Sequence, residues 1–99
     1  MGARIQKAQG QAPDERELRQ RFERDGLTPH SWSNGPRDRY ERHAHGYHKV
    51  LYCISGSIVF HTDDGDFELA PGDRLDVEPG TDHSATVGPE GVRCIEAAR

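Results

Sequence analysis

The sequence has few residues of several kinds, and each shortage argues against a class of protein. Only two of its 99 residues are cysteines and only two are lysines. No apolar stretch approaches the roughly 18 residues of a membrane span, and the N-terminus lacks the apolar centre of a secretory signal. The net charge of −4 gives no basic face to neutralise phosphates. We therefore expect a cytoplasmic protein that binds neither membranes nor nucleic acid.

The two cysteines, Cys53 and Cys94, lie in segments that are typical of β-strands. Cytosolic proteins keep their thiols reduced, and a free cysteine packs well as a small apolar residue. We therefore interpret both as reduced core residues rather than as a disulfide.

The remaining composition suffices for one small hydrophobic core. Hydrophobic residues make up 32% of the chain and charged residues 30%, with 11 glycines and 6 prolines. A chain of this length forms one domain and has no room for a second core. The many glycines and prolines favour short strands connected by turns.

The N-terminal part of the chain predicts a tail followed by a helix. Residues 1–12 carry no periodic pattern, so we expect a flexible tail. Residues 13–27 have acidic residues in the first turn, an apolar pair (Leu18 and Phe22) four positions apart, and Gly26 near the end. These features predict a short α-helix that lies on a surface with one narrow apolar face.

Residues 28–99 have the pattern of short strands separated by turns. Turn signals recur at intervals of about eight to twelve residues, and the strands between them are rich in β-branched and aromatic residues. Asp64 and Gly65 predict a two-residue turn that pairs the strands on either side. We therefore predict an all-β domain, a small antiparallel sandwich or barrel that closes its own edges.

Residues 37–45 (RDRYERHAH) are expected to form an extended strand that carries two histidines. Alternate residues of a strand share a face, so His43 and His45 point the same way as Arg39 and Glu41. Two imidazoles at this spacing can bind one metal ion from one side. Arg39 and Glu41 would then line the mouth of a ligand pocket, with Glu41 as an acceptor for an imidazole, or would form an ion pair at the rim.

The segments HAHGYHKVLYCISG and PGDRLDVEPGTDH together resemble the two motifs of the cupin superfamily. The matching histidines and glycines are His43, His45, Gly56, Gly72, Gly80 and His83. The resemblance implies that residues 28–99 form a small β-barrel of the jelly-roll type. It also implies that His43, His45 and His83 converge on a divalent transition metal ion, commonly iron, manganese, nickel or zinc.

Lys49 stands where the first cupin motif usually has a glutamate or glutamine ligand. A protonated ammonium donates hydrogen bonds and repels a cation, so Lys49 would instead anchor an anionic ligand beside a three-histidine site. His48 is a candidate fourth ligand. Strand alternation that points Lys49 inward points His48 outward, and a bulge near Gly46 would reverse the two. In a third interpretation the metal is lost and the histidines only line a polar pocket.

Two classes of function stay open at this point. The first is a single-domain cupin that binds a divalent metal and a small organic, in particular an anionic, ligand as a dioxygenase- or isomerase-type enzyme. The second is a non-catalytic small-molecule-binding or sensor module with a degenerate, metal-free site. The fold hosts many activities, so the resemblance does not choose between them.

Residues 50–54 (VLYCI) are apolar at every position. A barrel strand with two apolar faces needs a covering on its outer face as well as a core on its inner face. The N-terminal helix or a second subunit would supply this covering. Because cupins often dimerise through such a sheet, we expect a homodimer.

Overall fold

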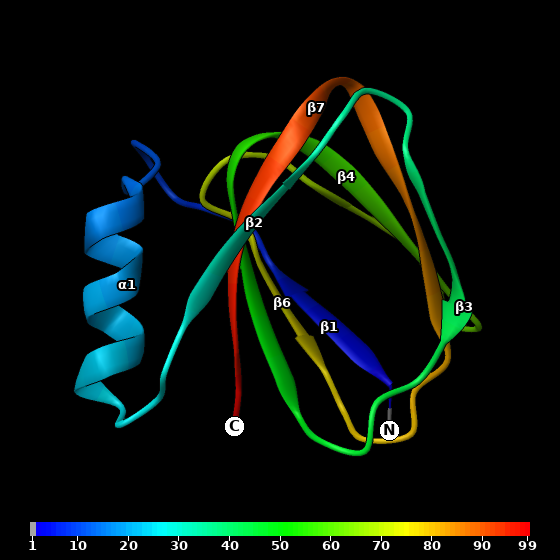
Figure 1. Ribbon diagram of the computed structural model, residues 1–99, viewed down its shortest axis with the longest axis horizontal. Helices are drawn as coiled ribbons and strands as arrows, with labels where there is room; N and C mark the ends of the chain where they lie inside the picture. Colours follow the sequence, from blue (N-terminus) through cyan, green and yellow to red (C-terminus); the bar gives the residue numbers. More distant parts are fainter. Residues whose placement is uncertain (1) are drawn as a thin grey trace.

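A computed structural model describes residues 2–99 of the chain, with one helix and seven strands in this range (Figure 1). In chain order these elements are β1 (Ala3–Gln6), α1 (Glu15–Arg24), β2 (His30–Asn34), β3 (Arg39–His43), β4 (Lys49–Thr62), β5 (Gly65–Leu69), β6 (Arg74–Val77) and β7 (His83–Ala98). All strand pairs are antiparallel, so the predicted all-β class with a short helix is confirmed.

Two long strands, β4 and β7, form the centre of the sheet. They pair with each other, β4 also pairs with β5 and β6, and β7 also pairs with β2 and β3. The turn signals predicted short strands throughout, whereas β4 has 14 residues and β7 has 16. The β4–β7 pairing instead shifts register around Ser55 and again after Gly56, so both strands bend without losing their partner. Figure 1 shows them curving over one end of the barrel.

Gly56 is the residue that allows this bend. Its φ angle is +75°, in the left-handed region that side chains disfavour, and a Cβ at this position would collide with the backbone carbonyl of Gly91 on β7. Steric hindrance therefore explains why a glycine stands at this position of the first cupin motif.

The hairpin between β4 and β5 forms as predicted, with its turn one residue earlier. Thr62 pairs with Gly65, so the two turn residues are Asp63 and Asp64. Gly65 itself adopts the positive φ, +120°.

The prediction of a flexible tail over residues 1–12 is wrong for its first half. Residues 3–6 form β1, which pairs with β6, and Ala3 and Ile5 pack against the core. The chain then continues to the buried carboxylate of Asp73, which accepts a hydrogen bond from the Ala8 amide at 2.7 Å. A four-residue strand with two apolar positions gives too short a pattern to be recognised.

Helix α1 covers the outer face of β4 and β7 (Figure 1). Its N-cap Asp14 accepts a hydrogen bond from the amide of Glu17 at 2.9 Å. Leu18 and Phe22 are buried and pack against the outward apolar residues of the two strands, among them Tyr52. The helix thus covers the outer face of the apolar segment VLYCI. The structure describes one chain, and the homodimer stays a prediction.

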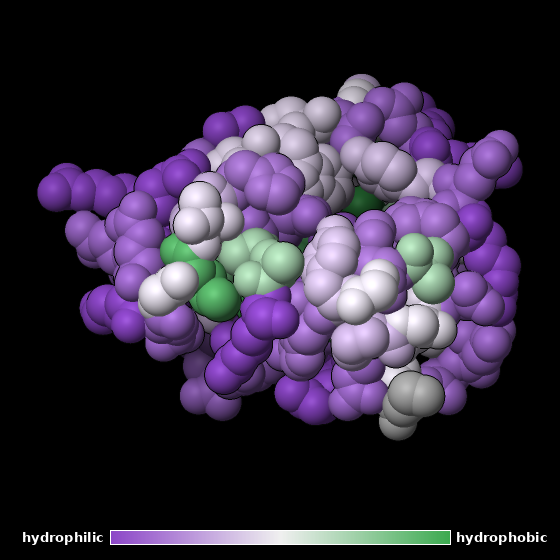
Figure 2. Space-filling model, turned by 60° about the horizontal axis from the view of Figure 1, so that its bottom comes forward, coloured by the Kyte–Doolittle hydropathy of each residue, from purple (hydrophilic) through white to green (hydrophobic). Residues whose placement is uncertain are grey.

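The inner face of the sheet forms the main core. It contains Leu51, Cys53, Ile58, Phe60, Leu69, Leu75, Val77, Ala85, Val87, Val92 and Cys94. Cys53 and Cys94 are paired positions on β4 and β7, and both are free and buried. Among residues 2–99, no helix is long and apolar enough to cross a membrane. On the face drawn in Figure 2 hydrophobic residues form only small, separate areas.

Candidate metal centre and ligand cavity

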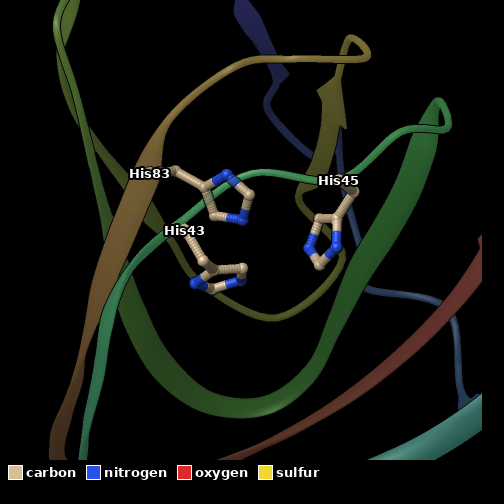
Figure 3. Close-up of side chains that lie close together, drawn as sticks. All are labelled: His43, His45 and His83. Atoms are coloured by element: carbon tan, nitrogen blue, oxygen red, sulfur yellow. The ribbon is translucent and has the colours of Figure 1, made fainter.

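Three histidines from different parts of the chain line one cavity of the barrel, and of the three only His83 is fully buried. His43 is the last residue of β3, His45 lies in the loop that follows, and His83 is the first residue of β7. The pairing of β3 with β7 puts His43 opposite His83. One ring nitrogen of each histidine lies within 4.8 Å of those of the other two. Figure 3 shows the three rings pointing toward one another.

Backbone carbonyls orient two of these rings. The Nδ1 of His43 lies 2.6 Å from the carbonyl oxygen of Glu41, and the Nδ1 of His83 lies 3.0 Å from that of Thr81. A ring that donates from Nδ1 carries its lone pair on Nε2, which is the form that binds a metal ion.

The Nε2 atoms of His45 and His83 are buried and have no hydrogen-bond partner among the described residues. Buried polar atoms are nearly always paired in proteins, so two facing orphans require an explanation. Imidazole nitrogens are the ligands that zinc, iron, nickel and copper take in proteins. The donor set of this cluster therefore fits a divalent transition metal ion.

The electrostatics favour the neutral, ligating form of the rings. Burial lowers the pKa of His83, and the neighbouring His43 and the Lys49 ammonium lower it further, against the opposing effect of the Thr81 carbonyl. Burial also lowers the pKa of His45, again with help from Lys49. The lowered pKa favours the neutral form of both imidazoles, which is the form that binds a metal ion.

The structure does not put the side chains of Arg39 and Glu41 beside the histidines, so that prediction is wrong. Tyr40 pairs with Ala85 and His43 with His83, which leaves one extra residue on β3. This bulge turns Tyr40 and His43 to the same side and leaves Arg39 and Glu41 exposed. Glu41 contributes its backbone carbonyl to His43 and not its carboxylate.

His48 lies outside the cluster. Its Nε2 is 2.9 Å from Oδ2 of Asp76 on β6, and the Asp76 carboxylate also accepts two hydrogen bonds from Arg74. The four-histidine alternative is therefore not the arrangement observed.

A cavity of about 260 Å³ adjoins the three histidines. Its lining is histidine, aromatic and charged: Trp32, Tyr40, His43, His45, Lys49, Phe60, His83, Ala85 and Glu96. Lys49 thus points inward, as strand alternation predicted for the register in which His48 points outward. At about 30 Å³ per water molecule, the space corresponds to roughly nine waters, enough for a small organic molecule.

Sequence reasoning missed Glu96, which lies inside the cavity beside Lys49. The Nζ of Lys49 is 3.1 Å from Oε1 of Glu96, and both side chains are only about one-tenth exposed. The indole nitrogen of Trp32 donates to the same oxygen at 2.7 Å. A signal was present: Cys94 lies in the core, and strand alternation points Glu96 to the same side.

Comparisons with known proteins agree on the fold. A family model described as an AraC-like ligand binding domain matches residues 26–95. An RmlC-like cupin from Shewanella frigidimarina NCIMB 400 is 26% identical, with a TM-score of 0.65 over 73% of this chain and 64% of that one. A cupin superfamily protein from Desulfitobacterium hafniense DCB-2 is 14% identical, with a TM-score of 0.66 over 97% of this chain and 75% of that one.

One curated relative is an enzyme. Quercetin 2,3-dioxygenase of Bacillus subtilis (strain 168) is 43% identical over an alignment of 54 residues, and the alignment covers 52% of this chain and 16% of that protein. The chain therefore spans about a sixth of the length of this relative.

Proposed function

The chain belongs to the family of AraC-like ligand-binding domains and has the cupin fold that its motifs predicted, and from this premise we propose that it binds a divalent transition metal ion through His43, His45 and His83. The observation that carries the proposal is the pair of buried, unpartnered Nε2 atoms on His45 and His83. A bound ion would supply a Lewis acid with open coordination positions toward the cavity.

The second part of the proposal is a small organic ligand in the adjoining cavity. The carbonyls of Glu41 and Thr81 hold two of the rings in place, so the metal site is formed before a ligand arrives. The cavity combines aromatic walls with a few charged groups, which is the usual character of a small-molecule site.

Two activities fit such a site, and each has one observation in its favour. The likeness to quercetin 2,3-dioxygenase favours a dioxygenase-type enzyme, with an isomerase as a related possibility for the same site. The matching family model describes a ligand-binding domain, which favours a non-catalytic module. We place the enzyme first because the site retains three ligand histidines. Oxygen uptake by the iron-loaded protein in the presence of a ligand would identify a dioxygenase, since neither an isomerase nor a binding module consumes oxygen.

The metal content of protein purified without chelator tests the proposal. We expect about one transition metal ion per chain in the wild type, and loss of that ion in His83→Ala. His48→Ala is the matched control and should retain the ion, because His48 contacts Asp76 and not the cluster. A wild type without bound metal, or equal metal in His83→Ala, contradicts the proposal.

The homodimer is proposed separately from the metal site. Helix α1 already covers the apolar outer face of β4 within one chain, so this face does not require a second subunit. Light scattering coupled to gel filtration gives the mass directly, and a monomer at micromolar concentration contradicts it.

A further inference from the structure

Lys49 and Glu96 form a second polar group in the cavity, distinct from the three histidines. They come from adjacent strands, β4 and β7, with Nζ and Oε1 3.1 Å apart. The indole N–H of Trp32 donates to that same Oε1 at 2.7 Å. One hydrogen bond and one ion pair thus hold the same carboxylate oxygen at the cavity wall.

The pair retains hydrogen-bonding capacity on both sides. A lysine ammonium has three N–H donors, and Glu96 Oε1 is the one acceptor recorded for Lys49 among residues 2–99. The recorded contact of Glu96 Oε2 is the ring of His30 at 3.7 Å, which is too long for a hydrogen bond. Lys49 and Glu96 both line the cavity, so an ammonium with further N–H donors and a carboxylate lie side by side on one of its walls.

The charges of the pair decide which chemical group fits there. A carboxylate would approach Lys49 but also the Glu96 carboxylate, and an ammonium would approach Glu96 but also Lys49. Like charges in close contact oppose binding. A neutral hydroxyl can accept from Lys49 and donate to Glu96 at once. Glu96 therefore removes the reason to expect an anion at Lys49.

The remaining walls suit a flat ring. Trp32 and Tyr40 pack edge to face with ring centroids 5.6 Å apart, and Phe60 also lines the cavity. Aromatic side chains in such arrangements favour another aromatic ring among them. The volume of about 260 Å³ admits one ring with small substituents.

We propose that the cavity binds a small hydroxylated aromatic molecule, whose neutral hydroxyl group lies between Lys49 and Glu96. An anionic oxygen at the other end of the molecule would face the three histidines. That second contact rests on the proposed metal function, whereas the preference for a neutral hydroxyl rests on the ion pair alone.

A matched series of benzoates tests the preference. The probes are benzoate and its derivatives with a hydroxyl, a carboxylate or an aminomethyl group, each as the 3- and the 4-isomer. Titration calorimetry on the zinc-loaded protein should give at least about tenfold tighter binding for a hydroxybenzoate than for the other three classes. A site that pairs a hydroxyl on both sides discriminates strongly against analogues without it.

Charge variants should change the order of affinities in a defined way. Glu96→Gln leaves the Lys49 charge alone, so the dicarboxylate should gain about tenfold relative to hydroxybenzoate. Lys49→Met should give the same gain to the aminomethyl compound. Each single variant leaves one buried charge without its partner and can fail to fold for that reason. The double variant Lys49→Met/Glu96→Gln leaves no such charge, and it should favour neither charged probe. Arg42→Ala removes an exposed cation that pairs with Asp63, and it should leave the order unchanged.

Each outcome supports or overturns the inference. A dicarboxylate that binds the wild type as tightly as hydroxybenzoate overturns it, and so does an unchanged order in all three variants. The same series on metal-free protein, followed by thermal shift, separates this inference from the proposed function. If zinc does not bind but the hydroxyl preference persists, only the metal proposal fails. If none of the probes binds either form, the inference is wrong.

Discussion

His43 and His83 are paired positions on β3 and β7, and their ring centroids lie 4.4 Å apart. The two residues are far apart in the sequence and meet because β3 carries one extra residue between Tyr40 and His43. With both Nδ1 atoms directed to backbone carbonyls, the cluster presents ring nitrogens to a common point. This is the arrangement that the proposed metal site requires, with two of its three rings already oriented by the backbone.

Lys49→Gln should tighten metal binding about tenfold. The Lys49 charge lowers the pKa of both His45 and His83, and the same repulsion acts on a metal cation. A glutamine also restores a ligand oxygen of the kind usual in cupins. Competition with a chelator measures the affinity, and Arg39→Gln, on an exposed position of β3, is the control. An unchanged or weaker affinity in Lys49→Gln would show that Glu96 already cancels the charge.

Gly56→Ala should lower the free energy of unfolding by about 3 kcal/mol. The new methyl group would need a left-handed backbone and would collide with the Gly91 carbonyl. Gly46→Ala is a matched control, since nothing lies within 4 Å of a Cβ there, and its effect should stay within about 0.5 kcal/mol. Urea denaturation of both metal-free variants gives the comparison. Equal stabilities would mean that the strands do not bend at Gly56.

Phe22→Ala should cost about 3 to 4 kcal/mol of stability. Phe22 is 3% exposed and packs edge to face on Tyr52, with ring centroids 5.6 Å apart, so its removal leaves a cavity under the helix. Glu23→Ala, on the exposed side of the same helix, should be nearly neutral. A neutral Phe22→Ala, measured by urea denaturation, would contradict the role of α1 as the covering of β4.

Asp76→Asn should destabilise the protein at pH 7 by about 3 kcal/mol, because it leaves Arg74 and His48 without their carboxylate. Burial alone would raise the pKa of Asp76, but the hydrogen bonds from Arg74 and His48 outweigh it and hold that pKa below its usual 3.8. A folded-state pKa below the unfolded one contributes stability above the unfolded pKa and loses it as the pH falls through the folded value.

The difference between wild type and Asp76→Asn should therefore shrink as the pH is lowered from 5 to below the folded-state pKa. Urea denaturation across this range measures it. Asp64→Asn, in the exposed hairpin turn, controls for the general effect of acid. A difference that does not depend on pH would mean that Asp76 is not ionised in the folded protein.

The sequence was sufficient for the parts of the fold that depend on periodic patterns. Alternation in KVLYCIS predicted that Lys49 and His48 point to opposite sides, and the observed register is the one without a bulge near Gly46, with Lys49 inward. The resemblance to the two cupin motifs predicted that His83 joins the first two histidines. Helix α1 followed from its apolar pair and its acidic first turn. Strand alternation and helical spacing repeat over several residues, so a short stretch of sequence is enough to predict them.

The features that could not be predicted depend on single residues and on distant contacts. The bulge on β3 reverses the direction of the side chains that precede it. Tyr40 therefore points toward the cavity, and Arg39 and Glu41 point away from it. Strand β1 is held by its pairing with β6 and by the hydrogen bond from the Ala8 amide to Asp73. Its four residues alone are too few to predict a strand. Glu96 was visible as an acid at an inward position, but its partners Lys49 and Trp32 lie on other strands.

A crystal structure of the zinc-loaded protein, with anomalous diffraction data collected on both sides of the zinc edge, tests the central claim most directly. The account predicts one anomalous peak per chain, bonded to one nitrogen each of His43, His45 and His83 at about 2.0 to 2.1 Å, with further coordination positions open toward the cavity. A peak elsewhere, or no peak among these three rings at full zinc loading, would contradict it.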